Sequence, residues 1–232
     1  MKIVVCVKQV PDTKGGVKFN PDGTLDRAAM LTIMNPDDKA GLEAALRLKD
    51  QYGAEVTVLT MGLPKADEVL REAMAMGADK GILVTDRVLG GADTWATSTT
   101  IAGALRNLDY DLIITGRQAI DGDTAQVGPQ VAEKLGLTQI TYAEEILKVA
   151  DGHITVKRHI DGGIETVEGP LPIVITVNGS AAPCRPRNAK LVQKYKHAKT
   201  VSEKQQGNLD YTDLYDKRDY LNLVEWLSLI HI

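Results

Sequence analysis

Apolar strand-like runs alternate with helical patterns from Ile3 to Leu135, and this alternation limits the possible folds more than any other feature. The runs are apolar throughout, which is typical of strands that are covered on both faces. Repeated β-α units of this kind predict an α/β fold, a doubly wound and mostly parallel Rossmann-like sheet. The predicted strands are 3–7, 56–60, 82–84 and 112–115, and the predicted helices are 36–52, 65–76, 94–105 and 124–135.

The pattern changes after residue 138. Two strand-like segments, 154–158 and 164–168, flank Asp161-Gly162-Gly163, which is a hairpin signal. With a further strand at 171–177, they predict an antiparallel hairpin extension of the same sheet. We expect a nucleotide- or flavin-binding domain over 1–180, including the hairpin region 153–177. A C-terminal arm over 181–232 would be packed on a partner or partly disordered.

Composition excludes several classes of protein. The net charge of −4 argues against nucleic acid as the main partner, because phosphate binding usually needs a basic excess. The two cysteines have no metal-type spacing, so we expect no metal site and a reducing compartment. No apolar run reaches the roughly 20 residues that span a bilayer. These features predict a cytoplasmic protein without membrane insertion.

Unusual residues follow four of the predicted strands, and ligands of open parallel sheets lie beyond these carboxyl ends. Two Gly-rich turns, at Gly91 and Gly122, lead into helices and could offer backbone N–H groups to a phosphate. The same glycines could instead serve only tight turns. The expected cofactor-binding residues are Lys8, Gln9, Val10, Asn35, Met61, Gly62, Gly91, Ala92, Asp93, Thr94, Thr97, Gly116, Arg117, Gln118, Asp121, Thr124, Ala125, Gln126, Val127 and Gly128.

Catalytic constellations are absent from the sequence. The four histidines lie away from the expected strand ends, and no Gly-x-Ser-x-Gly elbow occurs. Cys6 lies inside the first strand and is expected to be an inert core thiol. We therefore expect no catalytic residue and a binding subunit whose chemistry belongs to a cofactor.

The stretch from Val156 to Thr176 contains Val-x-Arg, Asp-Gly-Gly, Glu-x-Val and Leu-Pro-x-Val-x-Thr in that order. Together with segments 1–10, 34–36, 60–62 and 116–128, it resembles the β subunit of electron-transfer flavoproteins over about residues 1 to 200. The resemblance implies a domain like the adenine nucleotide α-hydrolases. It also implies a heterodimer with an α subunit that holds most of the redox FAD.

The loops Gly91–Ser98 and Asp121–Pro129 look like the electron-bifurcating and nitrogen-fixation-linked branch. In that branch the β pocket holds a second FAD that takes a hydride from NADH, whereas the ordinary branch holds a structural AMP. Small side chains at Ala92, Ala96 and Ala125 would leave room for a diphosphate. FAD is therefore the expected cofactor, AMP the alternative, and NADH a possible electron donor.

Further partners follow from the resemblance: acyl-CoA dehydrogenase or quinone oxidoreductase, and ferredoxin or flavodoxin. The loop 178–191, where the family docks on dehydrogenases, matches well only at Pro186-Arg187-x-Ala189. The family also continues past the end of this sequence, so we expect a truncated arm. A stand-alone nucleotide-binding stress-type protein is an alternative, although such a domain would need neither hairpin nor arm.

Overall fold

Nine strands form one sheet in the computed structural model, which describes residues 1–12, 31–199 and 223–227. The strands are β1 Lys2–Cys6, β2 Gln9–Pro11, β3 Thr32–Met34, β4 Glu55–Met61, β5 Lys80–Val84, β6 Leu112–Gly116, β7 Thr138–Ala150, β8 His153–Ile160, β9 Gly163–Pro170, β10 Ile173–Val177 and β11 Leu223–Leu227. The helices are α1 Pro36–Tyr52, α2 Asp67–Met76, α3 Thr94–Leu105, α4 Val127–Leu135 and α5 Ala189–Tyr195, with short turns η1 Pro64–Ala66 and η2 Arg87–Leu89.

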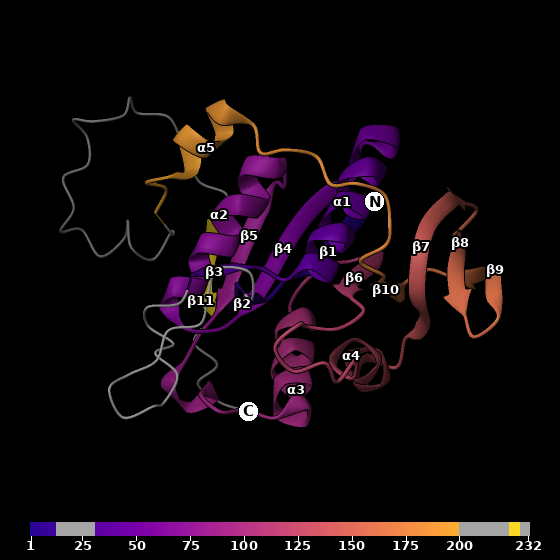
Figure 1. The fold of residues 1–232 in the computed structure, drawn as a ribbon, viewed down its shortest axis with the longest axis horizontal. Helices are drawn as coiled ribbons and strands as arrows, with labels where there is room; N and C mark the ends of the chain where they lie inside the picture. The colour runs from indigo at the N-terminus through magenta and orange to yellow at the C-terminus, as the bar shows by residue number, and fades with distance from the viewer. Residues whose placement is uncertain (13–30, 200–222, 228–232) are drawn as a thin grey trace.

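The large sheet has the order β11-β5-β4-β1-β6-β10-β7-β8-β9, and β2 pairs with β3 separately. All neighbours from β11 to β7 run parallel. Alternate residues of β1 face opposite cores: Val5 packs in a cluster with α1 and α2, whereas Val4 packs in a cluster with α3 and α4. Figure 1 shows the two helix layers and the hairpin that projects beyond them. The predicted doubly wound α/β fold is confirmed.

The last strand predicted near the hairpin lies elsewhere in the sheet. We expected 171–177 to belong to the antiparallel extension, but β10 runs parallel to both β6 and β7. Its five residues are all buried, as in a central strand. Segment 171–177 follows the hairpin directly in sequence, and for that reason it was assigned to the extension. The extension is instead supplied by β7, a strand that no sequence pattern predicted. Its first part pairs parallel with β10 and its second part antiparallel with β8.

The predicted hairpin itself is confirmed, with Asp161 and Gly162 between β8 and β9 and a φ of 126° at Gly162. Helix α1 spans the predicted residues and ends at Gly53, whose φ is 66°. Asn35 occupies the N-cap position, but its side chain does not cap the helix. Helix α4 begins at Val127 rather than Thr124, because Ala125 has a left-handed φ of 52°.

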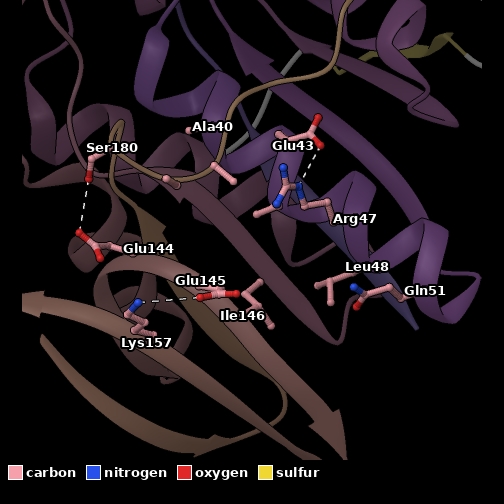
Figure 2. A pocket seen from close by; sticks show the side chains of 13 residues that line it. Ala40, Glu43, Arg47, Leu48, Gln51, Glu144, Glu145, Ile146, Lys157 and Ser180 are labelled. Atoms are coloured by element: carbon pink, nitrogen blue, oxygen red, sulfur yellow. Dashed lines mark hydrogen bonds and ion pairs between the residues drawn. The ribbon is translucent and has the colours of Figure 1, made fainter.

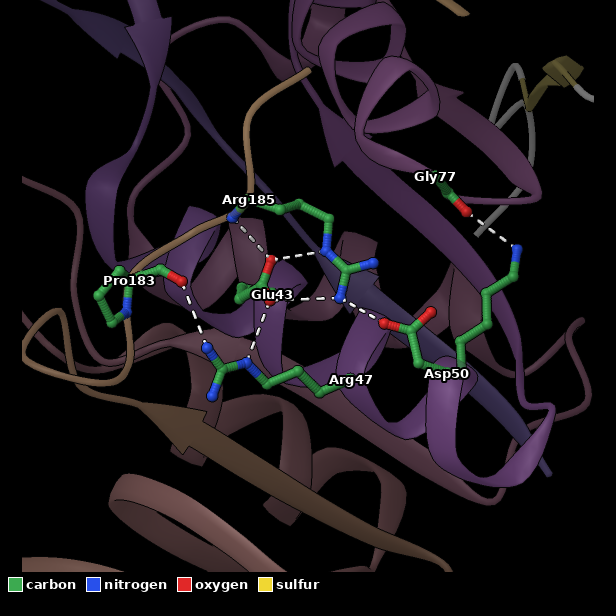
Figure 3. Close-up of polar contacts among 7 residues, drawn as sticks. Glu43, Arg47, Asp50, Gly77, Pro183 and Arg185 are labelled. Atoms are coloured by element: carbon green, nitrogen blue, oxygen red, sulfur yellow. Dashed lines mark hydrogen bonds and ion pairs between the residues drawn. The ribbon is translucent and has the colours of Figure 1, made fainter. Parts of the chain in front are cut away.

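The described part of the predicted arm packs on its own chain, and its packing on a partner stays a prediction. Buried Glu43 of α1 accepts hydrogen bonds from the Arg185 backbone N–H at 3.0 Å and from Nε at 2.9 Å. Arg47 Nε donates to the same carboxylate at 3.1 Å (Figure 3). Burial acts to raise the pKa of Glu43, but the bonds from Arg185 and Arg47 outweigh it and lower that pKa.

Helix α5 continues the arm across α2, as Figure 1 shows. Arg71 of α2 donates to the carbonyls of Tyr195 at 2.7 Å and Ala198 at 2.9 Å. Strand β11, in a region expected to be polar and weakly periodic, joins the sheet beside β5. The expectations for 200–222 and 228–232 lie outside the described residues. A boundary at residue 180 stays a prediction.

Candidate functional site

A cavity of about 380 Å³ lies at the carboxyl ends of β1, β4, β5 and β6, and we call it the strand-end cavity. Strand β1 is flanked by β4 and β6, and the chain crosses to opposite faces of the sheet on its two sides. Such a switch point is where open α/β sheets bind ligands, because the loops diverge there and leave a crevice. The starts of α3 and α4 close its side.

Most of the residues predicted from the sequence line this cavity. They are Lys8, Met61, Gly62, Gly91, Ala92, Asp93, Thr94, Thr97, Gly116, Arg117, Gln118, Thr124, Ala125, Gln126, Val127 and Gly128. The fold therefore brings together four loops that lie far apart in the sequence. Their contact with a cofactor remains a prediction.

Gln9, Val10, Asn35 and Asp121 do not line the cavity. Val10 is fully buried in the core, and Gln9 Nε2 donates to Thr32 Oγ1 at 3.0 Å and to Glu68 at 2.9 Å.

The other two residues support the loop after β6. Buried Asn35 donates to the Gln118 carbonyl at 2.7 Å and accepts from the Ile120 N–H at 3.1 Å. Asp121 accepts two bonds from Lys8 Nζ, at 2.7 and 2.8 Å. Asn35 and Asp121 thus shape the cavity from behind its surface.

Sequence reasoning missed several lining residues, namely Cys6, Val7, Asp38, Leu63, Asp86, Leu89, Ile101 and Thr115. Gly90, Ala119, Gly122 and Asp123 also line the cavity and belong to the two loops singled out from the sequence. Cys6 is the last residue of β1, and its position at a carboxyl end was the available signal. Burial, followed by the charge of Asp38, raises the pKa of the Cys6 thiol to about 12. The thiol is therefore protonated and serves as an apolar wall.

Asp38 forms the cavity floor from the first turn of α1. Its Oδ2 accepts from the Lys8 N–H at 2.8 Å and its Oδ1 from the Gly116 N–H at 3.0 Å, which ties the ends of β1 and β6 together. Burial is the main reason that the pKa of Asp38 rises to about 7, with Asp37 adding to it, and hydrogen bonds from Asn35, Lys8 and Gly116 oppose the rise. A titratable carboxyl therefore faces the cavity at neutral pH.

The two helix starts differ in what they offer to an anion. Asp93 Oδ1 accepts from the Ala96 N–H at 2.8 Å and so caps α3. Helix α4 has no side-chain cap at Gln126. The loop before α4 has left-handed φ values at Asp123 (48°) and Ala125 (52°), a backbone form that can turn N–H groups toward one point. The start of α4 is therefore the better place for a phosphate.

Part of the cavity lining is apolar. The apolar side chains are Val7 just after β1, Met61 and Leu63 at and after the end of β4, Leu89 of η2 and Ile101 of α3. Leu63 is 69% exposed, so some of this apolar lining lies at the mouth. The cavity thus joins a helix start suited to phosphate with a wall suited to a planar ring.

A second hollow of about 340 Å³ lies between α1 and the strands β7 and β8, and Figure 2 shows its lining. Its charged groups pair with each other: Arg47 Nε lies 3.1 Å from Glu43, and Lys157 Nζ lies 4.0 Å from Glu145. Its lining comes from within α1, from β7 and β8 and from 180–182, whereas the strand-end cavity is lined by the ends of strands and the starts of two helices. We therefore favour the strand-end cavity as the candidate site.

The described ranges also bear on two other kinds of site. Across residues 1–12, 31–199 and 223–227, no cluster of His, Cys, Asp or Glu could hold a metal ion. Within the same ranges, no helix is long and apolar enough to cross a membrane.

Comparison with known proteins identifies the family. Residues 22–205 match the electron transfer flavoprotein domain. The chain belongs to the electron transfer flavoprotein family. The predicted resemblance is confirmed.

Three relatives with assigned names are similar to this chain. The acryloyl-CoA reductase electron transfer subunit gamma of Anaerotignum propionicum is 55% identical over 179 residues, 76% of this chain and 67% of that protein. The electron transfer flavoprotein subunit beta of Clostridium acetobutylicum is 54% identical over 177 residues, which are 76% of this chain and 68% of that protein. Protein FixA of Azorhizobium caulinodans is 48% identical over 185 residues, which are 76% of this chain and 66% of that protein. The role of the chain is thus that of a β-type electron transfer subunit.

Proposed function

We propose that the strand-end cavity of this electron transfer flavoprotein subunit binds FAD and that the chain passes electrons to an α-type partner subunit. One observation supports this most strongly: a helix start without a side-chain cap and a group of apolar side chains line the same cavity. The first suits a diphosphate and the second suits an aromatic ring system. A flavin dinucleotide contains both parts.

At the polar end, the N–H groups of Val127 and Gly128 begin α4 beside the cavity, where the helix dipole favours negative charge. Ala125 precedes them with a left-handed backbone, and its methyl group leaves room near the helix start. Arg117 brings a positive charge to the same loop. Thr94 donates to Gln126 Oε1 at 2.8 Å, which holds the two helix starts together.

At the apolar end, Met61, Leu89 and Ile101 would pack on a ring and exclude water from it. FAD, when bound, supplies hydride acceptance from NADH and single-electron transfer. Hydride transfer needs no acid or base from the chain, which agrees with the absence of a catalytic pattern in the sequence. The task of these residues is to bind and orient.

The partners in this proposal follow from the resemblance and the relatives. NADH is the proposed electron donor and an electron transfer flavoprotein α subunit the heterodimer partner. One relative is named as a subunit of an acryloyl-CoA reductase. A reductase or dehydrogenase of acyl-CoA thioesters is therefore a proposed further partner, as are a quinone oxidoreductase, ferredoxin and flavodoxin.

AMP in the same cavity is the second candidate, and the cavity volume favours it. About 380 Å³ lies near the lower end of the roughly 300–1,000 Å³ range of ligand pockets. A mononucleotide would be enclosed, whereas the ring of FAD would extend toward the mouth beside Leu63. In this case the nucleotide would be structural.

Denaturing the purified complex and identifying the released nucleotides separates the two candidates. We expect two flavins for each pair of subunits and bleaching of flavin absorbance when NADH is mixed in by stopped flow. Release of AMP with one flavin, and no bleaching, would establish the structural role instead. Release of no nucleotide from this chain would overturn both.

A further inference from the structure

Arg117 is held from two sides at the edge of the strand-end cavity. Its Nε donates to Asp37 Oδ2 at 3.2 Å, and its guanidinium carbon lies 5.8 Å from the centre of the Tyr142 ring. Asp37 is only 7% exposed, so this carboxylate has a fixed position at the start of α1. Among the described residues, the structure gives the two terminal nitrogens of Arg117 no hydrogen-bond partner.

Tyr142 reaches Arg117 through an irregular backbone. Its φ of 59° lies in the left-handed region, which an aromatic residue rarely adopts. The register between β7 and β10 shifts between Ile175 and Val177, and the Tyr142 N–H donates at 3.1 Å to the side-chain Oγ1 of Thr176 on β10. Irregularities of this kind re-aim a side chain and are frequent next to functional sites.

The other cation of the cavity lining, Lys8, is paired with a carboxylate, as Arg117 is, but through its only nitrogen. Lys8 Nζ donates to both oxygens of Asp121, which leaves one of its three N–H groups for a ligand. Arg117 instead turns only Nε toward Asp37. A planar guanidinium in this state can use its terminal nitrogens as a fork for two phosphate oxygens.

We propose that Tyr142 and Asp37 are positioning residues that aim the free fork of Arg117 at a phosphate of the bound nucleotide. This inference rests on the proposed function, because it requires a phosphate-bearing ligand in the strand-end cavity. It goes beyond that function in assigning a role to a residue of β7 that does not line the cavity. The nucleoside part of the ligand makes no use of this contact.

The test compares AMP with adenosine, which lacks only the phosphate, by calorimetric titration of the nucleotide-free full chain. Tyr142→Asn removes the ring but keeps a residue that tolerates a left-handed backbone. It should lower the ratio of AMP to adenosine affinity by about two- to five-fold. Tyr142→Phe keeps the ring and should leave the ratio at the value of the unsubstituted chain. Arg117→Met should lower the ratio by about ten-fold or more. Leu147→Ala, at an exposed position of β7, is the control.

An unchanged ratio in Tyr142→Asn overturns the inference, and so does an equal loss of AMP and adenosine affinity, which would mean a purely structural role. An unchanged ratio in Arg117→Met overturns it as well. Failure of the unsubstituted chain to bind AMP, adenosine or FAD would instead overturn the proposed function, and the inference with it.

Discussion

Gly128 lies where α4 meets the sheet, and any side chain there would collide with the strands. A Cβ would lie 2.7 Å from Thr115 Oγ1 and 2.8 Å from Thr176 Cγ2. From the sequence, a bulky residue at this position would remove nucleotide binding while the fold survived. The structure does not support the second part, because the clash is with the sheet rather than with the cavity alone.

We therefore predict that Gly128→Ala lowers the free energy of unfolding by about 1–3 kcal/mol even without a ligand, since α4 must move away from the strands. Gly122→Ala, in the loop before α4, is the control, because a Cβ there meets nothing within 4 Å. Urea unfolding of both variants measures the difference. Equal stabilities would mean that α4 accommodates the methyl group.

Asp38 gives a second prediction at the scale of one residue. Its pKa rises to about 7 in the folded chain, whereas an unfolded Asp titrates near 3.9. Between these values the folded state holds the proton and the unfolded state does not, so stability falls as pH rises from about 4 to about 7.

Asp38→Asn has no titratable group at position 38. The free energy of unfolding of the original chain, relative to that of this variant, should therefore fall between about pH 4 and about pH 7 and level off above pH 7. Urea unfolding at several pH values, without ligand, measures the difference. A difference that rises with pH, or stays flat, would contradict the burial of Asp38 as described.

Among the elements, the first part of the arm depends on one buried carboxylate. Glu43 accepts three bonds from Arg185, whereas Arg47 gives it one and is half-exposed. We predict that Arg185→Ala costs about 2–4 kcal/mol and exposes the arm to trypsin, because it leaves a buried charge poorly paired. Arg47→Ala should cost about 1 kcal/mol or less. Digestion at equal rates in both variants would contradict this anchoring role.

Some helices and strands could be predicted from the sequence and others could not. Strands β1, β4, β5 and β6 and helices α1 and α3 were predicted from apolar runs and helical patterns, because these signals are local. Strand β7 was missed since it alternates irregularly around Tyr142 and serves two partners. The position of β10 depends on long-range pairing, which no local pattern reports. Asp38 was not predicted as a site residue, because its contacts with Lys8 and Gly116 cross 30 and 78 residues.

At the scale of the whole molecule, we predict that the chain requires its partner. Exposed Leu63, Val88 and Trp95, at 69%, 79% and 66% exposure, lie at or next to residues of the cavity lining. An obligate interface buries about 2,000 Å² or more in total. Light scattering should find self-association of the isolated chain and a defined pair with an α subunit. A stable monomer that does not bind the α subunit would contradict this.

The central claim is that the loop before α4 receives the diphosphate of a flavin, and Ala125 tests it most directly. Asp and Asn both tolerate the left-handed φ of 52°, so Ala125→Asp and Ala125→Asn should fold alike. Only Asp would place a negative charge beside the diphosphate. The measurement is FAD affinity by titration of the nucleotide-free variants. We predict that Ala125→Asp binds FAD more than about ten-fold more weakly than Ala125→Asn; equal affinities would contradict the claim.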